Sequence, residues 1–148
     1  MLRGNHPATV DGKGRLKIPT AIKTYLDENY GADFYVTSTS LTGQYVRLYP
    51  LPVWEEIEKK LKAQPSFSKP VKKLLELTNY YGQEARADSH GRILIPSTLR
   101  ESAAMQGEVA VLGYLDYLEV WNNQRYREHL ESDPLTDEDL KALSELGI

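Results

Sequence analysis

Two arginines, Arg15 and Arg92, stand at the same place in a phrase that the chain spells twice. The phrase reads VDGKGRLKIP over residues 10–19 and ADSHGRILIP over residues 87–96, with no gap between the copies. A guanidinium is a planar fork of N–H donors that matches a phosphate or the O6 and N7 edge of guanine. The two arginines therefore indicate recognition of an anion, and the repeated phrase must position them.

The charges around the two arginines differ between the copies. The first copy adds Lys13 and Lys17, which suit phosphate contacts that carry no sequence information, whereas the second has His90 and Leu94 at those places. The first copy is therefore the more basic of the two. A two-stranded β-ribbon fits the major groove of B-DNA.

The phrase itself predicts a tight β-hairpin. An aspartate, Asp11 or Asp88, opens each turn by accepting backbone N–H groups ahead of it. A glycine three residues later, Gly14 or Gly91, suits a left-handed position with a G1 bulge. Isoleucines and leucines alternate with the polar residues of the following strand, and a proline then begins a short helix. These four turn residues are assigned a structural role.

The repeat extends beyond the hairpins. Residues 34–38 and 45–49 read as a strand pair followed by a helix over 51–61, and residues 109–113, 117–121 and 124–130 read as the same set. We predict an α+β fold of two tandem β-β-α-β-β-α modules in a pseudo-twofold relation, with a C-terminal helix capped by Thr136. The predicted domains are residues 1–63 for the first module, 64–80 for a helical connector, 81–131 for the second module and 132–148 for an acidic tail.

The D-x-x-G-R-x-x-I-P phrase at the start of a small hairpin module resembles the AbrB/SpoVT swapped-hairpin class of bacterial DNA-binding domains. Two copies in one chain, with RGNHPATVDGKGRLKIP near the start and LYPLPVWEEIEKKL between them, are similar to the MraZ family. The resemblance covers about residues 1–131. It implies that each module resembles an AbrB-like small β-barrel.

The resemblance also implies a function. It implies a transcriptional regulator, most simply a repressor, of the division and cell-wall gene cluster. Such a regulator would bind short direct repeats in a promoter as a ring-shaped homo-oligomer in the cytoplasm, at the nucleoid. It further implies that Asp11 with Arg15, and Asp88 with Arg92, belong to the DNA-facing surface. Because the second copy is the less basic, we expect the first hairpin to be the stronger contact with double-stranded DNA and the second to be a supporting or structural copy.

Some alternatives stay open for the basic residues. Arg15 or Arg92 could simply pair with the aspartate of its own turn, which is compatible with DNA contact because a carboxylate can hold an arginine in position. Arg3 and Arg86 flank the hairpins and are added as further DNA-binding candidates, although either could be an ordinary solvated arginine. The strand aromatics Tyr45, Tyr49, Tyr117 and Trp121 are expected to pack in the core or between the two modules, and Trp54 is expected in the core.

The charge distribution supports a nucleic-acid partner despite a net charge of −3. Residues 128–148 carry seven acidic side chains and one lysine, so the preceding 127 residues have a net charge of +3. An acidic tail on a basic body is a marked asymmetry. For the tail itself, the simplest interpretation is a solvated amphipathic helix.

Other function classes find little support in the sequence. The chain has no cysteine, and its three histidines are far apart and lack zinc-site spacing. It also lacks G-x-S-x-G and P-loop motifs, a signal-peptide core and a membrane-length apolar run. We therefore expect no enzyme activity, metal, cofactor, small-molecule substrate or membrane partner. An oligomeric protein-binding scaffold or antitoxin-like partner is the alternative to a DNA-binding regulator.

Overall fold

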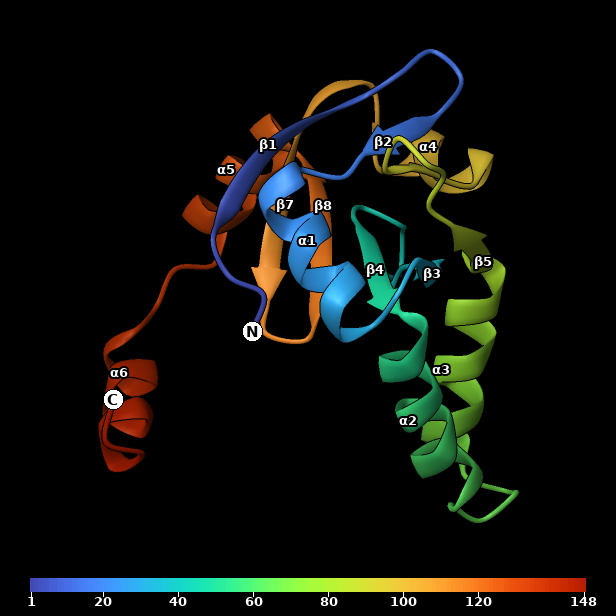
Figure 1. The fold of residues 1–148 in the computed structure, drawn as a ribbon. Coiled ribbons are helices and arrows are strands. Elements are labelled where there is room, and N and C mark those ends of the chain that lie inside the picture. Colours follow the sequence, from blue (N-terminus) through green and yellow to red (C-terminus); the bar gives the residue numbers. More distant parts are fainter.

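The computed structural model describes all 148 residues and contains eight strands and six helices (Figure 1). The first repeat contributes, in chain order, β1 (Asn5–Val10), β2 (Arg15–Lys17), α1 (Thr20–Asn29), β3 (Asp33–Thr37), β4 (Val46–Pro50) and α2 (Leu51–Lys62). The linking helix α3 (Lys69–Tyr80) precedes the second repeat, which contributes β5 (Gln83–Arg86), β6 (Arg92–Leu94), α4 (Ser97–Ser102), β7 (Gly107–Tyr114), β8 (Tyr117–Asn122) and α5 (Asn123–Ser132). A last helix, α6 (Asp137–Glu145), ends the chain. The predicted α+β order, its repetition and the C-terminal helix are confirmed.

All eight strands belong to one sheet, in the order β5-β3-β4-β8-β7-β1-β2-β6. β1 of the first repeat pairs with β7 of the second, and β5 of the second pairs with β3 of the first, in both cases antiparallel. The hairpin between β5 and β6 joins the two ends of this order, because the Asp88 N–H donates to the Arg92 carbonyl over 2.9 Å. The sheet is therefore nearly closed into a barrel, and the repeats exchange their first strands.

The barrel order also carries the expected pseudo-twofold relation. Exchanging each strand for its counterpart in the other repeat leaves the closed order unchanged. The pseudo-twofold axis passes between β2 and its counterpart β6. There Leu16 of β2 lies opposite Ile93 of β6, and both side chains are fully buried. Burying each such side chain contributes about 1.5–3 kcal/mol. The hydrophobic residues of the repeated phrase therefore join the two copies at their shared strand pair.

Alternate residues of the strands fill the barrel interior, as period-two patterning requires. On β4 and β8, the inward residues Val46, Leu48, Leu118 and Val120 are all completely buried. Helices α1 and α4, which follow the two hairpins, bury equivalent apolar side chains against the same core. The hairpins are thus held by a continuous core that both repeats build.

The outward residues of β4 and β8 form a second, mixed cluster. The Arg47 Nε lies 3.1 Å from Glu119 Oε2, and Arg47 also donates to the Tyr49 hydroxyl over 2.9 Å. Glu119 is only 3% exposed, and its other oxygen accepts a 2.8 Å hydrogen bond from Trp121 Nε1. The carboxylate is therefore satisfied on both oxygens, as a buried charge must be.

Aromatic rings surround this ion pair. Tyr45 stacks on Trp121 with centroids 5.0 Å apart, and the Arg47 guanidinium lies 4.8 Å from the Tyr117 ring centroid. The ring centroids of Trp54 and Tyr49 lie 5.0 Å apart, and this contact packs α2 against the sheet. Tyr45 with Trp121 and Tyr49 with Tyr117 join the two repeats, so these strand aromatics pack between the modules on the outer face of the sheet and not in the barrel core.

Two helical parts project from the barrel (Figure 1). Helices α2 and α3 run side by side as an arm on one side, whereas α6 stands apart on the other side. Helix α6 is closed at its start by a capping box, in which the Thr136 hydroxyl accepts the Asp139 N–H and the Asp139 carboxylate accepts the Thr136 N–H. None of the helices combines the length and the hydropathy that crossing a membrane would require.

Candidate nucleic-acid interface

The first hairpin turn is organised by Asp11. Its Oδ1 accepts the backbone N–H groups of Lys13 and Arg15, each over 2.9 Å, and the Gly14 N–H donates to its carbonyl over 3.0 Å. Gly14 has a φ of +83°, the left-handed region that glycine adopts at little cost. The turn therefore has the predicted chemistry, with aspartate as acceptor and glycine at the left-handed position.

Asp11 also holds the side chain of Arg15. The Arg15 Nε donates to Asp11 Oδ2 over 2.9 Å, and the two side chains are 38% and 36% exposed. The pKa of Asp11 lies below its ordinary value of 3.8, chiefly because the carboxylate accepts the Arg15 backbone N–H and also because of the guanidinium. This pair uses only Nε, so the two terminal nitrogens of Arg15 keep their donors for another partner.

The second turn repeats the backbone geometry without the ion pair. Asp88 Oδ1 accepts the N–H groups of His90 and Arg92, each over 2.9 Å, and Gly91 has a φ of +73°. The pKa of Asp88 is lowered, first by the Arg92 N–H and then by the His90 N–H. The Arg92 guanidinium makes no hydrogen bond or ion pair within the chain. The pairing considered for both arginines therefore occurs at Arg15 alone.

The antiparallel pairing of β2 with β6 brings the two hairpins together. Arg15 lies opposite Leu94, and Lys17 lies opposite Arg92. Leu16 and Ile93 between them point into the core, so alternation places the other four on the outward face of this two-stranded ribbon. Cations from both repeats thus share one surface, which is the candidate interface.

Reciprocal contacts lock each hairpin onto the other repeat. The Ile18 N–H donates to the Gly91 carbonyl over 2.8 Å, and the Ile95 N–H donates to the Gly14 carbonyl over 3.0 Å. Lys17 Nζ adds a 2.6 Å hydrogen bond to the His90 carbonyl. The two turns therefore form one rigid unit, in which neither can move without disturbing the other.

Arg100 is a residue of this unit that the sequence reasoning missed. Its Nη1 donates to the Lys13 carbonyl over 2.9 Å, and its side chain occupies the space where a Cβ on Gly14 would point. In the other repeat, Lys23 packs beside Gly91 in the corresponding place. The repeat offset that relates Arg15 to Arg92 also relates Lys23 to Arg100. A basic residue at the equivalent position of both repeats was therefore the sequence signal that could have identified Arg100.

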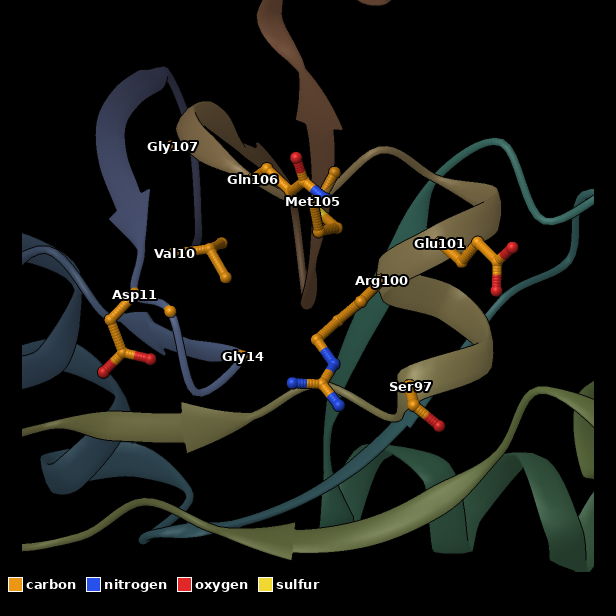
Figure 2. Close-up of a pocket in the computed structure, with 10 residues that line it drawn as sticks. Val10, Asp11, Gly14, Ser97, Arg100, Glu101, Met105, Gln106 and Gly107 are labelled. Atoms are coloured by element: carbon orange, nitrogen blue, oxygen red, sulfur yellow. The ribbon is translucent and has the colours of Figure 1, made fainter.

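A polar cavity of about 540 Å³ opens beside the first turn, between the end of β1 and α4 (Figure 2). Figure 2 shows the Arg100 side chain extending from α4 toward Gly14 at its centre. Asp11 and Glu101 also line the cavity. Arg100 therefore reaches across the cavity and braces the turn from behind through its hydrogen bond to the Lys13 carbonyl.

The remaining two candidate residues lie outside the ribbon face. Both oxygens of Asp33 accept hydrogen bonds from Arg86 Nη1 over 3.0 Å, and these residues face each other across β5 and β3. Arg3 precedes β1 at the end opposite the hairpin, next to the Leu2–Leu115 bridge. Arg3 and Asp11 are eight positions apart along a nearly extended chain, a distance of about 25 Å. The structure therefore gathers Lys13, Arg15, Lys17 and Arg92, and leaves Arg3 apart.

The chain is similar in sequence to proteins of one known family. Residues 1–77 and 82–145 match the family described as "MraZ protein, putative antitoxin-like". A protein named Transcriptional regulator MraZ from Acidobacterium capsulatum is 46% identical over 148 residues, all of both chains. Its namesake from Koribacter versatilis is 48% identical over 149 residues, again all of both chains. A third, from Tolumonas auensis, is 35% identical over 146 residues, 99% of this chain and 91% of that relative.

Proposed function

The chain belongs to the MraZ family, and on that premise we propose that it is a DNA-binding transcriptional regulator that contacts double-stranded DNA through its paired hairpins. Its relatives are named as regulators and not as enzymes, in agreement with the expectation from the sequence. The observation that carries the proposal is the outward face of the β2–β6 ribbon. That face presents Arg15, Lys17 and Arg92 from two repeats on one surface.

Stability of the fold does not account for this arrangement. Lys17 and Arg92 stand directly opposite each other, and like charges at such positions destabilise a strand pair. An anion lying across the ribbon would offset the repulsion. A DNA backbone supplies closely spaced phosphates, and its major groove admits a two-stranded ribbon.

The side chains divide naturally between two kinds of contact. Arg15 is aimed by Asp11 through Nε and keeps its terminal nitrogens for a phosphate or a guanine edge. Lys13 and Lys17 supply phosphate contacts. We keep the first hairpin as the principal contact, and the position of Arg92 opposite Lys17 gives the second hairpin a share in the same surface.

The assembly and target are also part of the proposal. One DNA-binding module buries only about 600–1,000 Å² of protein, so useful affinity requires several hairpin pairs acting together. A ring of identical subunits presents them at a regular spacing that suits short direct repeats in a promoter. We propose that this protein acts in the cytoplasm, at the nucleoid, and represses the division and cell-wall gene cluster by covering its promoter DNA.

Substitution of the ribbon arginines tests this function. Arg15→Ala should weaken binding to promoter DNA by about 1–3 kcal/mol per engaged hairpin if the arginine reads a base. Arg92→Ala should weaken it in the same direction. Arg127→Ala, which removes an exposed arginine from α5, is the matched control for net charge. Gel-shift titrations at fixed salt give the dissociation constants, and equal affinity for Arg15→Ala and Arg127→Ala would refute the assignment.

Salt dependence gives an independent check. Contacts with phosphates release counterions, so the logarithm of the binding constant should fall linearly with the logarithm of salt concentration. Removing Lys17 as Lys17→Ala should reduce that slope by about 1. A slope unchanged from the wild type would exclude Lys17 from the phosphate contacts.

The family description favours one second candidate, an antitoxin-like protein that binds another protein through the same hairpins. The Arg15 titration separates the two. A protein partner retained by a chain that shows no affinity for promoter DNA would support the second candidate.

A further inference from the structure

The end of the α2–α3 arm is a strongly basic surface far from the hairpins. We call residues 59–73 the arm tip. It carries six exposed lysines and no acidic residue, namely Lys59, Lys60, Lys62, Lys69, Lys72 and Lys73. Only Lys59 and Lys72 have ion-pair partners, at 2.9 Å and 3.9 Å. Four lysines of the tip are therefore left without a counter-charge.

Local stability does not explain these lysines. Helix α3 begins with Lys69 and has no acidic residue in its first turn, and its N-cap residue Ser68 makes no side-chain capping bond. The positive end of the helix dipole therefore meets positive side chains, which is unfavourable. Phe67, in the loop between the two helices, is 85% exposed. The tip thus presents an exposed aromatic ring on a segment whose lysines are mostly unpaired.

The C-terminal helix α6 carries the opposite charge. Helix α6 has Asp137, Glu138 and Asp139 in its first turn and Glu145 in its last. Its leucines are open to solvent, with Leu140 52% and Leu146 74% exposed. No hydrogen bond or ion pair joins this helix to the barrel or to the arm.

A nine-residue helix of this kind needs a surface to pack on. Isolated helices shorter than about 12–15 residues are marginal in water, and an amphipathic one gains most of its stability from burying its apolar side. The capping box at Thr136 and Asp139 nevertheless fixes where this helix begins. The sequence therefore specifies a helix whose stabilising surface is absent from the single chain.

We propose that α6 of one copy docks on the arm tip of a second copy, with its acidic residues on the unpaired lysines and its leucines against Phe67. Figure 1 shows α6 and the arm on opposite sides of the molecule. The connector Asp133–Thr136 spans about 14 Å at most, which favours a partner chain over the helix's own arm. A contact between two different surfaces is head to tail and links copies in series.

DNA is the competing occupant of the arm tip. The tip lies at the opposite end of the molecule from the β1–β2 turn (Figure 1). Its exposed aromatic ring matches the leucines of an amphipathic helix, whereas a phosphate backbone would leave it uncovered. The docking of α6 does not rest on the proposed DNA-binding function, because self-association is measured on the protein without DNA.

Reciprocal charge reversal in the full chain tests the docking. The tip variant is Lys60→Glu, Lys62→Glu and Lys73→Glu, none of which has an ion-pair partner in the chain. The tail variant is Asp137→Lys, Glu138→Lys and Glu145→Lys, which leaves the capping residues intact. A control, Glu28→Lys with Asp116→Lys, changes the net charge in the same direction as the tail variant but away from both surfaces.

Sedimentation velocity at low and moderate salt measures self-association. Each variant alone should weaken association about tenfold, and the control should not, because three exposed ion pairs together are worth about one decade. An equimolar mixture of the two variants should restore association, since every tip then finds a tail of opposite charge. Raising the salt should weaken the wild type and the mixture alike.

Four results would overturn the proposal. The wild type could remain a monomer of 16.8 kDa at every concentration. In a second result, neither variant alone changes self-association. In a third, the mixture of variants does not recover association but a single chain that carries both sets of reversals does, which would mean that α6 folds back on its own arm. Finally, the tip variant could lose DNA affinity with unchanged association, which would assign the tip to DNA.

Discussion

Replacing Gly14 by alanine tests whether the first turn and Arg100 act as one unit. At φ +83° an L residue is disfavoured by roughly 1–2 kcal/mol. The new Cβ would also meet the Arg100 guanidinium, which must leave the Lys13 carbonyl and lose a hydrogen bond worth about 1 kcal/mol. The expected loss in the free energy of unfolding is therefore about 2–3 kcal/mol.

Gly12→Ala is the matched control in the same turn, since Gly12 lacks a positive φ and nothing lies within 4 Å of its added Cβ. In thermal unfolding, the Tm of Gly14→Ala should lie about 5–10 °C below the Tm of Gly12→Ala. The double variant Gly14→Ala with Arg100→Ala should lose about 1 kcal/mol less than the sum of the two single changes, because the same hydrogen bond is removed in both. Equal stability of Gly14→Ala and Gly12→Ala, or strict additivity, would refute the reasoning.

Two further predictions follow from charges in the fold. Arg47→Met should destabilise the protein by about 2–4 kcal/mol, because it leaves the buried Glu119 carboxylate with only Trp121 as a partner. Glu56→Gln, which breaks an exposed pair, should change the unfolding free energy by less than about 1 kcal/mol in the same urea titrations. Similar losses for both would contradict the role given to Glu119. Because the pKa values of Asp11 and Asp88 are lowered in the fold, their stabilisation is present above the ordinary value of 3.8 and is lost as the pH falls through the lowered values. Carboxyl-carbon NMR titrations should give midpoints below 3.8 for both residues, and midpoints at or above it would show that the turn hydrogen bonds do not form in solution.

The hairpins could be predicted from the sequence because their chemistry is local. An aspartate and a glycine three residues apart specify the turn, and alternating isoleucines specify which face is buried. Both features are visible within ten residues. The helix cap by Thr136 is local in the same way, and it was predicted for the same reason.

The strand exchange could not be predicted from these patterns. Alternation tells which side of β1 is buried, but it is the same whether β1 pairs with β3 of its own repeat or with β7 of the other. Arg100 was missed because a single basic residue on a short helix has no local signature. The ion pair of Arg15 was considered in advance, but its absence at Arg92 depends on side-chain placement that the shared phrase does not encode. The DNA contacts of Arg15, Lys13, Lys17, Arg92, Arg86 and Arg3 stay predictions.

The exchange of first strands has a consequence for synthesis of the protein on the ribosome. β1 emerges first, yet its long partner β7 ends at Tyr114, more than a hundred residues later. At about 5–20 residues per second, the amino-terminal strand waits roughly 5–20 s before it can complete its pairing. During that interval the nascent first repeat has an unfinished sheet edge, which is the condition under which neighbouring nascent chains pair wrongly. The charged turn DGKGRLK follows β1 directly, and charged side chains beside a strand edge disfavour such wrong pairing.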